Sequence, residues 1–291
     1  MKRYGVAAGL LLALALALAL ASSGSAAHDA FPGGNGRIAF LRGNQKLFVM
    51  NADGSHQNRL LRNAGVAPAW SPDGRRLIAV GGFGTPPAHV DPEFVSSPVG
   101  SPSWSPDGRH FVGITGGDSL NEVDVVDVDS GVQRQIYLDD GMGLPTPFNP
   151  AWSPDGRLIA FNDERGNLFF LVGAQHRLRA PAHGIGGMDP AWSPDGRQLA
   201  VGTFTGVYLP GPTPKSSSVF TARADGTQFR RIARNASQPA WSPDGRKIVF
   251  VRLLARGNSE IFVMNADGTH QRRLTFNPGA DSAPDWQPLP R

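Results

Sequence analysis

The sequence predicts an all-β fold, a six-bladed β-propeller that is closed by pairing of its N-terminal strands with its C-terminal strand. First, all six tryptophans lie in copies of one phrase, which in full reads Pro-x-Trp-Ser-Pro-Asp-Gly-Arg. Second, successive tryptophans are 34, 48, 40, 49 and 45 residues apart, which is the period of a propeller blade. Third, the two chain ends supply complementary parts of one more repeat. The copies contain Trp70, Trp104, Trp152, Trp192, Trp241 and, in a shortened form, Trp286.

The repeat that contains Trp241 predicts four antiparallel strands. Proline presets the backbone at the start of each Ser-Pro-Asp-Gly turn, and Asp-Gly supplies the positive φ that closes it. Short segments in which apolar residues alternate predict strands on either side. In order, the expected elements are strand 239–241, turn 242–245, strand 247–250, strand 260–264, turn 265–268 and a strand ending at 273–275.

The third strand and the turn after it recur in most repeats. The corresponding segments are 47–54, 125–131, 168–173 and 219–226. The segment between Trp70 and Trp104 is short and lacks this phrase. We therefore expect that blade to have a missing or irregular strand.

The chain ends predict how the ring closes. Gly36–Phe40 reads as a second strand without a tryptophan phrase before it, and Trp286 belongs to a first strand with no second strand after it. Together they would form a sixth blade from three N-terminal strands and one C-terminal strand, which leaves no exposed sheet edge between the ends.

The first 27 residues resemble a secretory signal. Lys2 and Arg3 precede an apolar run from Val6 to Ala21, and small residues at 25–27 offer a cleavage site. An uncleaved membrane anchor is the alternative, but the run is about 16 residues long and a span needs about 20. We expect a signal peptide at 1–27, a single propeller domain at 28–291, no transmembrane span after cleavage, and an exported, periplasmic or secreted, monomer.

Composition excludes some classes of protein. The chain has no cysteine, so neither a disulfide nor a lipid-modified cysteine is possible. An exported chain of this length can instead rely on a large core. Removal of Lys2 and Arg3 lowers the net charge from +4 to +2, which gives no electrostatic reason to expect nucleic-acid binding.

The repeated phrases resemble one known family. Pro-x-Trp-Ser-Pro-Asp-Gly, then Ile-Phe-Val-Met-Asn-Ala-Asp-Gly and Arg-Arg-Leu-Thr, are similar to the TolB-type propeller repeat over about residues 33–290. Such repeats occur in the Tol translocation protein of the bacterial periplasm, in peptidase propellers and in some polysaccharide lyases. The Tol protein carries an α/β domain ahead of its propeller. Only a few residues separate the expected signal peptide from the first expected strand here, so we expect no counterpart of that domain.

The topology sorts the loops onto two faces. The short Ser-Pro-Asp-Gly and Asn-Ala-Asp-Gly turns lie on one, which we call the tight-turn face. The other, the long-loop face, carries the longer irregular stretches at 82–100, 180–188, 202–218 and 253–258. Because binding residues concentrate on loops held by a rigid scaffold, we expect the functional face to be the long-loop face.

One position in each repeat varies while its neighbours stay constant, namely the residue before the blade-opening proline. These residues are Ala67, Ser101, Asn149, Asp189, Gln238 and Ala283. Each should approach the central channel on the long-loop face. We expect the four polar ones, Ser101, Asn149, Asp189 and Gln238, to bind a polar ligand or a peptide end. A water-filled funnel is the alternative.

Catalytic patterns are weak. The chain has no Gly-x-Ser-x-Gly elbow, and five turn aspartates and the tryptophans are most simply structural. His89 and His183 fall in long loops, where they could share a metal with Asp91 or Asp189, but they lack the spacing of a known ligand set. We therefore expect no catalytic residue, no metal ligand and no cofactor.

Two functions remain open at this point. The favoured one is a non-enzymatic binding or scaffolding propeller that recognises a protein segment or an envelope component on the long-loop face. The alternative is a metal-assisted lyase or hydrolase that acts on a carbohydrate or lactone at the channel mouth. Its residues would be His89, His183, Asp189 and Asn149.

Overall fold

A computed structural model of the chain describes residues 30–43, 45–81, 92–116, 121–138, 143–180, 186–203, 217–254 and 257–290. Within these ranges the regular structure consists of 23 strands. No helix among these residues has the length and apolar character needed to cross a membrane. The expected signal peptide at 1–27 lies outside the described residues.

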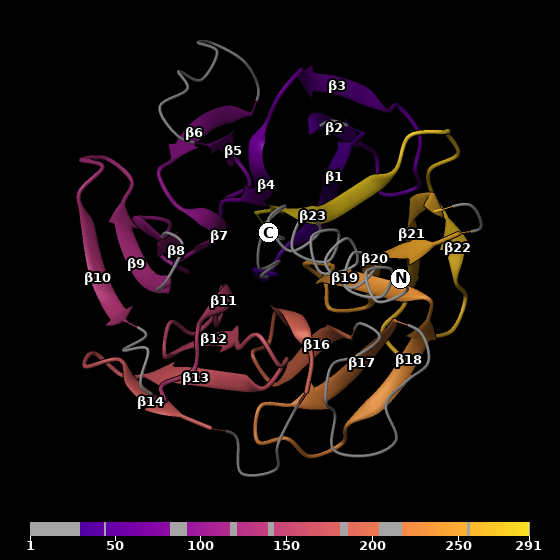
Figure 1. The fold of residues 1–291 in the computed structure, drawn as a ribbon. Coiled ribbons are helices and arrows are strands. Elements are labelled where there is room, and N and C mark those ends of the chain that lie inside the picture. The colour runs from indigo at the N-terminus through magenta and orange to yellow at the C-terminus, as the bar shows by residue number, and fades with distance from the viewer. Residues whose placement is uncertain are drawn as a thin grey trace, which may run out of the picture.

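Six sheets are arranged in a ring around a central axis (Figure 1). Blade 1 contains β4 (Gly65–Trp70), β5 (Arg76–Gly81) and β6 (Glu93–Ser97). Blade 2 contains β7 (Gly100–Trp104), β8 (His110–Gly116), β9 (Asn121–Asp127) and β10 (Gln133–Leu138). Blade 3 contains β11 (Phe148–Trp152), β12 (Leu158–Asn162), β13 (Leu168–Val172) and β14 (Arg177–Arg179). Blade 4 contains β15 (Met188–Trp192), β16 (Gln198–Thr203), β17 (Ser218–Arg223) and β18 (Arg230–Arg234).

Blade 5 contains β19 (Ala236–Trp241), β20 (Lys247–Leu253), β21 (Ser259–Asn265) and β22 (Arg272–Arg273). Blade 6 contains β23 (Asp281–Leu289), β1 (Gly34–Arg42), β2 (Lys46–Met50) and β3 (Asn58–Leu61). In every blade the strand that carries the tryptophan is the first strand of its sheet, and each contacts the first strands of both neighbouring blades. These six strands therefore line the channel, and the all-β six-bladed fold is as predicted.

The predicted closure is confirmed in blade 6. The C-terminal strand β23 pairs antiparallel with the N-terminal strand β1, and the two lie side by side in Figure 1. Trp286 faces Ile38 in this register, and Asp285 faces Ala39. The ring is thus closed by hydrogen bonds between segments almost 250 residues apart in sequence.

Blade 1 is irregular, as its short sequence predicts. In its described residues it has three strands where the other blades have four, and β6 runs parallel to β5. The connection between them includes residues 82–91, which lie outside the described residues. A parallel neighbour needs a crossover rather than a hairpin, so blade 1 departs from the repeat after its second strand.

The tryptophans pack between blades. Trp192 of blade 4 lies beside Phe170 of blade 3, with ring centroids 6.0 Å apart, and its indole Nε1 donates to the carbonyl of Ala151 at 3.1 Å. Trp104 donates to the carbonyl of Ala69 in the preceding blade in the same way, at 2.9 Å. These two indoles therefore fill the gap between blades and also hydrogen-bond across it, which agrees with the expected structural role.

The Ser-Pro-Asp-Gly turns share one hydrogen-bond pattern. In blade 5 the Ser242 hydroxyl donates to Asp244 at 2.6 Å and accepts from the Lys247 amide at 2.9 Å, while the Arg246 amide donates to Asp244 at 3.0 Å. The other four full-length turns repeat these bonds. Each turn aspartate is thus engaged with its own turn, as expected for a structural role.

Candidate functional site at the channel mouth

The variable positions before the blade-opening prolines lie at the long-loop end of the channel. Asn149 follows Phe148, which pairs with Asn162 at the end of β12, where the loop to the next strand begins. At the other end of the same strand, Trp152 leads into the tight turn. The same registers hold in blades 4 and 5. These residues therefore mark one mouth of the channel.

Five of the six positions share an unusual backbone conformation. Their φ angles are between +47° and +51°, and the register of each first strand shifts at or beside this point. The five residues are Ser101, Asn149, Asp189, Gln238 and Ala283. Glycine adopts this left-handed region readily, and asparagine and aspartate adopt it more often than most other residues do. For the remaining residues it is unfavourable. Because Ala283 shares the conformation, it belongs to the repeat, and only the side chain varies.

Blade 1 departs from this pattern too. Ala67 is not among the residues with positive φ, whereas Gly65, two residues earlier, has a φ of +78°. Its register shift spans Gly65 to Ala69. Ala67 is buried and contributes only a methyl group to this part of the channel.

Three of the predicted binding residues form a hydrogen-bonded row across blades 2, 3 and 4. The Ser101 hydroxyl donates to Asn149 Oδ1 at 3.1 Å, and Asn149 Nδ2 donates to Asp189 Oδ1 at 3.0 Å. Asn149 Nδ2 also lies 3.4 Å from the side-chain oxygen of Asn162. Bonds at both ends of the Asn149 amide fix its orientation, so Ser101 and Asp189 position Asn149.

The fourth predicted residue makes a separate contact between blades 5 and 6. Gln238 Oε1 accepts a hydrogen bond from the backbone amide of Ala283 at 2.9 Å. Within the described residues, Gln238 Nε2 has no hydrogen-bond partner. This amide is a donor that a ligand at the mouth could use.

Burial separates the four residues into two pairs. Ser101 and Asp189 are 5% and 4% exposed, whereas Asn149 and Gln238 are half-buried. A ligand at the mouth would therefore reach the carboxamides of Asn149 and Gln238 first. The sequence pattern identified the four positions. It could not distinguish the accessible residues, Asn149 and Gln238, from the buried residues, Ser101 and Asp189, that position Asn149.

The chain's own N-terminal segment lies across the tight-turn end of the ring. The amide of Ala30 donates to the carbonyl of Trp192 at 3.4 Å, and the amide of Gly33 donates to the carbonyl of Pro243 at 3.1 Å. Phe31 is 4% exposed and packs in the cluster that contains Trp70. Segment 30–35 thus contacts blades on opposite sides of the ring and covers this end of the channel. No pattern in the sequence predicted this contact.

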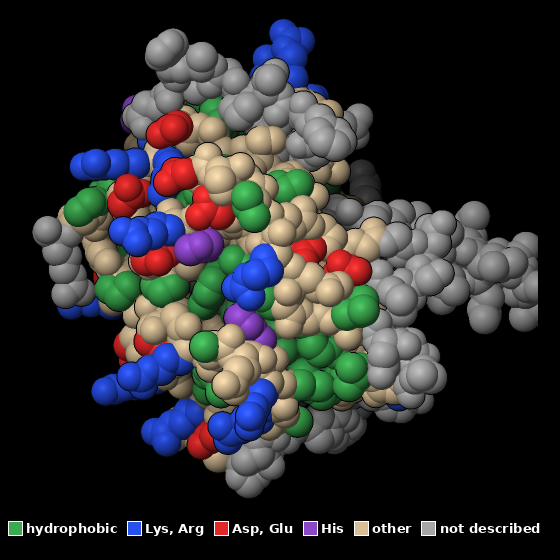
Figure 2. All heavy atoms as spheres, turned by 90° about the vertical axis from the view of Figure 1, so that its left-hand side faces the viewer, with side chains coloured by type: hydrophobic (Ala, Val, Ile, Leu, Met, Phe, Trp, Pro, Cys, Tyr) green, Lys and Arg blue, Asp and Glu red, His purple; other side chains and the backbone are tan. Residues whose placement is uncertain are grey.

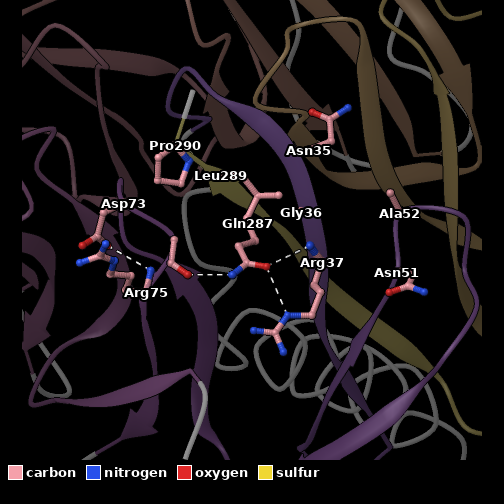
Figure 3. A pocket seen from close by; sticks show the side chains of 11 residues that line it. Asn35, Gly36, Arg37, Asn51, Ala52, Asp73, Arg75, Gln287, Leu289 and Pro290 are labelled. Atoms are coloured by element: carbon pink, nitrogen blue, oxygen red, sulfur yellow. Dashed lines mark hydrogen bonds between the residues drawn. The ribbon is translucent and has the colours of Figure 1, made fainter.

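Two cavities lie on the tight-turn face. One of about 760 Å³ sits between blades 6 and 1, and a second of about 550 Å³ sits between blades 4 and 5. Figure 3 shows the first, and the side chains it labels spread around the rim without meeting at one point. This arrangement contrasts with the hydrogen-bonded row at the long-loop mouth.

Gln287 lines the first cavity. In the other blades this position is the serine of the tight turn, but β23 has no hairpin to the second strand of its blade. Gln287 Oε1 accepts from the Arg37 amide at 3.1 Å and its Nε2 donates to the Gly74 carbonyl at 2.7 Å. The long side chain thus joins β1 of blade 6 to the tight turn of blade 1. Sequence reasoning missed this role, although the substitution of serine by glutamine was visible.

The residues of the metal-dependent alternative cannot be placed together. His89, His183 and Asp91 lie outside the described residues. Among the described residues, no group of three or more histidine, cysteine, aspartate or glutamate side chains has the geometry to hold a metal.

Comparisons with known proteins agree with the fold. The family described as the TolB beta propeller domain matches residues 187–289. No curated protein matches the chain by sequence. The crystal structure of TolB from Acinetobacter baumannii is similar with a TM-score of 0.70 and 18% identity, over 89% of this chain and 68% of that one. An oligogalacturonate lyase in complex with manganese is similar with a TM-score of 0.50 and 17% identity, over 86% of this chain and 77% of that one.

At sequence identities of 17% and 18%, these solved structures support a shared fold and not a shared function. The family match covers most of blades 4 and 5 and the C-terminal strand, and the repeated phrases extend the same pattern around the ring. The chain is therefore a six-bladed β-propeller, and its residues 187–289 match the TolB beta propeller domain.

Proposed function

We propose that this protein is an exported binding or scaffolding propeller that recognises a protein segment or an envelope component at the long-loop mouth of its channel. The observation that carries the proposal is the row of Ser101, Asn149 and Asp189, whose hydrogen bonds hold one carboxamide in a fixed orientation at the mouth. Both Nδ2 hydrogens of Asn149 bond within the chain, so its Oδ1 offers an acceptor while Gln238 Nε2 offers a donor, and a peptide backbone has the complementary groups.

Two further features support the choice of this mouth. Gln238 adds a second half-buried carboxamide two blades away from Asn149, with a donor that has no partner among the described residues. The other end of the channel is covered by segment 30–35. A ligand of the channel would therefore enter it from the long-loop face. Export rests on the signal-like pattern of residues 1–27.

Site-specific photocrosslinking in the native host tests this proposal. A photoreactive amino acid replaces Leu144, an exposed residue shortly before Asn149, in one strain. In a second strain it replaces Arg197, whose side chain is 85% exposed at a tight turn. We expect a discrete crosslinked product from position 144 and none from position 197.

The same experiment is repeated with Asn149→Ala combined with Gln238→Ala. Loss of the product at position 144, with unchanged protein level and melting temperature, supports recognition by the two carboxamides. Arg157→Ala, at an exposed tight-turn residue, serves as the control and should leave the product intact. Equal crosslinking from both faces, or a product that survives the double substitution, would rule the channel mouth out.

A further inference from the structure

Blades 5 and 6 hold one arginine each in matching surroundings. The guanidinium of Arg42 lies 5.1 and 4.6 Å from the centroids of two phenylalanine rings, and the guanidinium of Arg252 lies at the same two distances from its own pair. The rings belong to Phe40 and Phe48 in blade 6 and to Phe250 and Phe262 in blade 5. Each guanidinium also donates from Nη2 to a glutamine side chain, Gln57 or Gln271.

The two sites differ in one residue on the first strand. In blade 6, Asp281 faces Arg42, and its carboxylate accepts from Nε at 2.7 Å and from Nη2 at 3.0 Å. In blade 5, Ala236 faces Arg252 in the same register. The repeat therefore keeps the guanidinium and its aromatic support but replaces the carboxylate by a methyl group.

Within the described residues, Arg252 makes no ion pair. Glu260 faces it on the neighbouring strand β21, but the Glu260 carboxylate already accepts from Arg273 at 2.7 Å and from the Asn277 amide at 3.0 Å. Partial burial lowers the pKa of Arg252, because water solvates its charge incompletely. An arginine remains protonated at neutral pH, and the partners of this cation in the described part of the chain are the two rings and one glutamine.

Arg252 lies at the seam between blades 4 and 5. Phe250, beneath its guanidinium, packs in the cluster that contains Val219 and Ile232 of blade 4. Gln271, its hydrogen-bond partner, donates to the carbonyl of Ile232 at 3.0 Å.

Charges of both signs line this seam. At its tight-turn end, Arg230 of β18 lies among Asp195, Asp244 and Asp267, and it donates to the Asp267 carbonyl at 3.3 Å. On the side of the molecule that includes β10 and β14, positive and negative side chains are likewise interspersed (Figure 2). Arg252 is therefore distinguished by the missing carboxylate on the first strand of its blade, and not by the net charge of the seam.

We propose that Arg252 binds a carboxylate of a ligand at the seam between blades 4 and 5. Blade 6 shows how a carboxylate engages this guanidinium, because Asp281 does so from within the chain. The flanking phenylalanine rings hold the guanidinium in place, so little side-chain freedom is lost on binding. Ala236 precedes Gln238 by two residues on β19, so an extended ligand at the channel mouth could also place an acidic side chain here. The carboxylate site does not depend on the channel-mouth proposal, and each can be wrong alone.

A binding assay with an acidic peptide tests this site. The probe is an N-acetylated peptide of five glutamates carrying a rhodamine label, and its affinity for the mature protein is measured by fluorescence anisotropy at low salt. Three variants each lower the net charge by one. Arg252→Gln removes the guanidinium, Ala236→Asp supplies a carboxylate from within the chain, and Arg157→Gln removes an exposed charge on blade 3 as the control.

We expect Arg252→Gln and Ala236→Asp each to raise the Kd about five-fold or more, and Arg157→Gln to change it less than about two-fold. Ala236→Asp is the decisive variant, since it keeps Arg252 and its surroundings. Thermal melts confirm that each variant is folded, and Arg252→Gln provides a second test if Ala236→Asp is not. An Ala236→Asp protein that binds as well as the wild type would overturn the proposal. So would equal losses in all three variants, or no binding by the wild type.

The source of the anion is distinguished by competition. Acetate should displace the probe in a manner that depends on Arg252, and inorganic phosphate at the same ionic strength should do so less well. Stronger displacement by phosphate, with the same dependence on Arg252, would overturn the assignment to a carboxylate.

Discussion

Blades 5 and 6 share the third-strand phrase Phe-Val-Met-Asn-Ala-Asp-Gly, yet only blade 5 is built from one continuous segment. In blade 5 a tight turn joins the first and second strands, and its serine and aspartate bond within the turn. In blade 6 the first strand comes from the C-terminus and the second from the N-terminus. No turn joins them.

In blade 6, side-chain contacts hold the first strand in place, whereas in blade 5 a turn joins the first strand to the second. Asp281 on β23 binds Arg42 on β1 through two bonds, and Gln287 on β23 bonds the backbone of Arg37 and of Gly74 in blade 1. Asp285 accepts from the amide of Trp70 at 2.6 Å. A hairpin keeps its strands close in the unfolded chain as well, so it lowers the entropy cost of pairing. Where the ends meet without one, the polar contacts stabilise the pairing.

The largest expected effect is at the ion pair of blade 6. Asp281→Ala removes a fully buried carboxylate from Arg42, whose side chain is only 16% exposed. Breaking such a pair leaves a cation without its partner, and we expect a loss of about 3 kcal/mol in the free energy of unfolding. Chemical denaturation measures it. Arg252→Ala in blade 5, which breaks no ion pair, should cost about 1 kcal/mol through lost packing on the rings. Equal losses would mean that the ion pair does not hold the closure.

A smaller difference is expected between Gln287 and its counterpart Ser242. Gln287→Ala leaves two backbone groups of neighbouring strands without their bonds, which should cost about 2 kcal/mol. Ser242→Ala loses bonds within a turn that the chain still connects, and should cost about 1 kcal/mol. The two variants are compared by the midpoint of denaturation with the slope held equal. A Ser242→Ala protein that is the less stable of the two would contradict the role assigned to Gln287.

Acid should weaken the tight turns, which contain aspartates. It should not weaken the contacts of Gln287, whose carboxamide stands where the other blades have a turn serine. Partial burial alone would raise the pKa of Asp244, but hydrogen bonds from Ser242 and the Arg246 amide outweigh it, so the pKa lies below its ordinary value of 3.8. The same balance lowers the pKa of Asp73, Asp107 and Asp155. A lowered folded-state pKa gives stability that is present above the unfolded-state pKa and is lost as pH falls through the folded-state value.

The free energy of unfolding should therefore decrease as the pH falls below about 4, as measured by denaturation at a series of pH values. Asp244→Asn removes one of the groups involved. It should make the decrease shallower while lowering stability at neutral pH. Gln287→Ala should leave the slope unchanged, because a carboxamide does not titrate. A slope that Asp244→Asn does not alter would show that this turn takes no part in the acid response.

The smallest effects are expected at the channel mouth. Ala283 and Gln238 have φ angles of +49° and +48°. Ala283→Gly relieves a strained backbone at the expense of greater freedom in the unfolded chain, so stability should change by less than about 1 kcal/mol. Gln238→Gly gains the same relief but loses the bond to the Ala283 amide, and should be the less stable variant. Thermal melts compare them, and a more stable Gln238→Gly protein would show that this bond contributes little.

Much of the fold could be predicted because its signals are local. Each Ser-Pro-Asp-Gly turn bonds within itself, so the five copies locate five pairs of strands without knowledge of the rest of the chain. The short segment after Trp70 likewise predicted an irregular blade, although not that β6 would pair parallel to β5. Parallel pairing depends on where the crossover returns, which a short apolar segment does not encode.

The site could be predicted only as a set of positions. The variable residue before each proline was identifiable, and Asn149 and Asp189 do meet across blades 3 and 4. Their exposure was not predictable, because it depends on how neighbouring blades turn toward each other. The ion pair of Asp281 with Arg42 was equally hidden, since its partners are separated by 239 residues.

The sequence by itself determined the repeat, the number of blades and the manner of closure, because turn chemistry and strand alternation act over a few residues and recur with a fixed period. The tertiary structure decided which residues of neighbouring repeats touch. It brought Ser101, Asn149 and Asp189 into one row, placed segment 30–35 across the tight-turn end, and left Arg252 without the carboxylate that Arg42 has. These contacts depend on the close packing of whole blades around a ring, a long-range property that no single repeat contains.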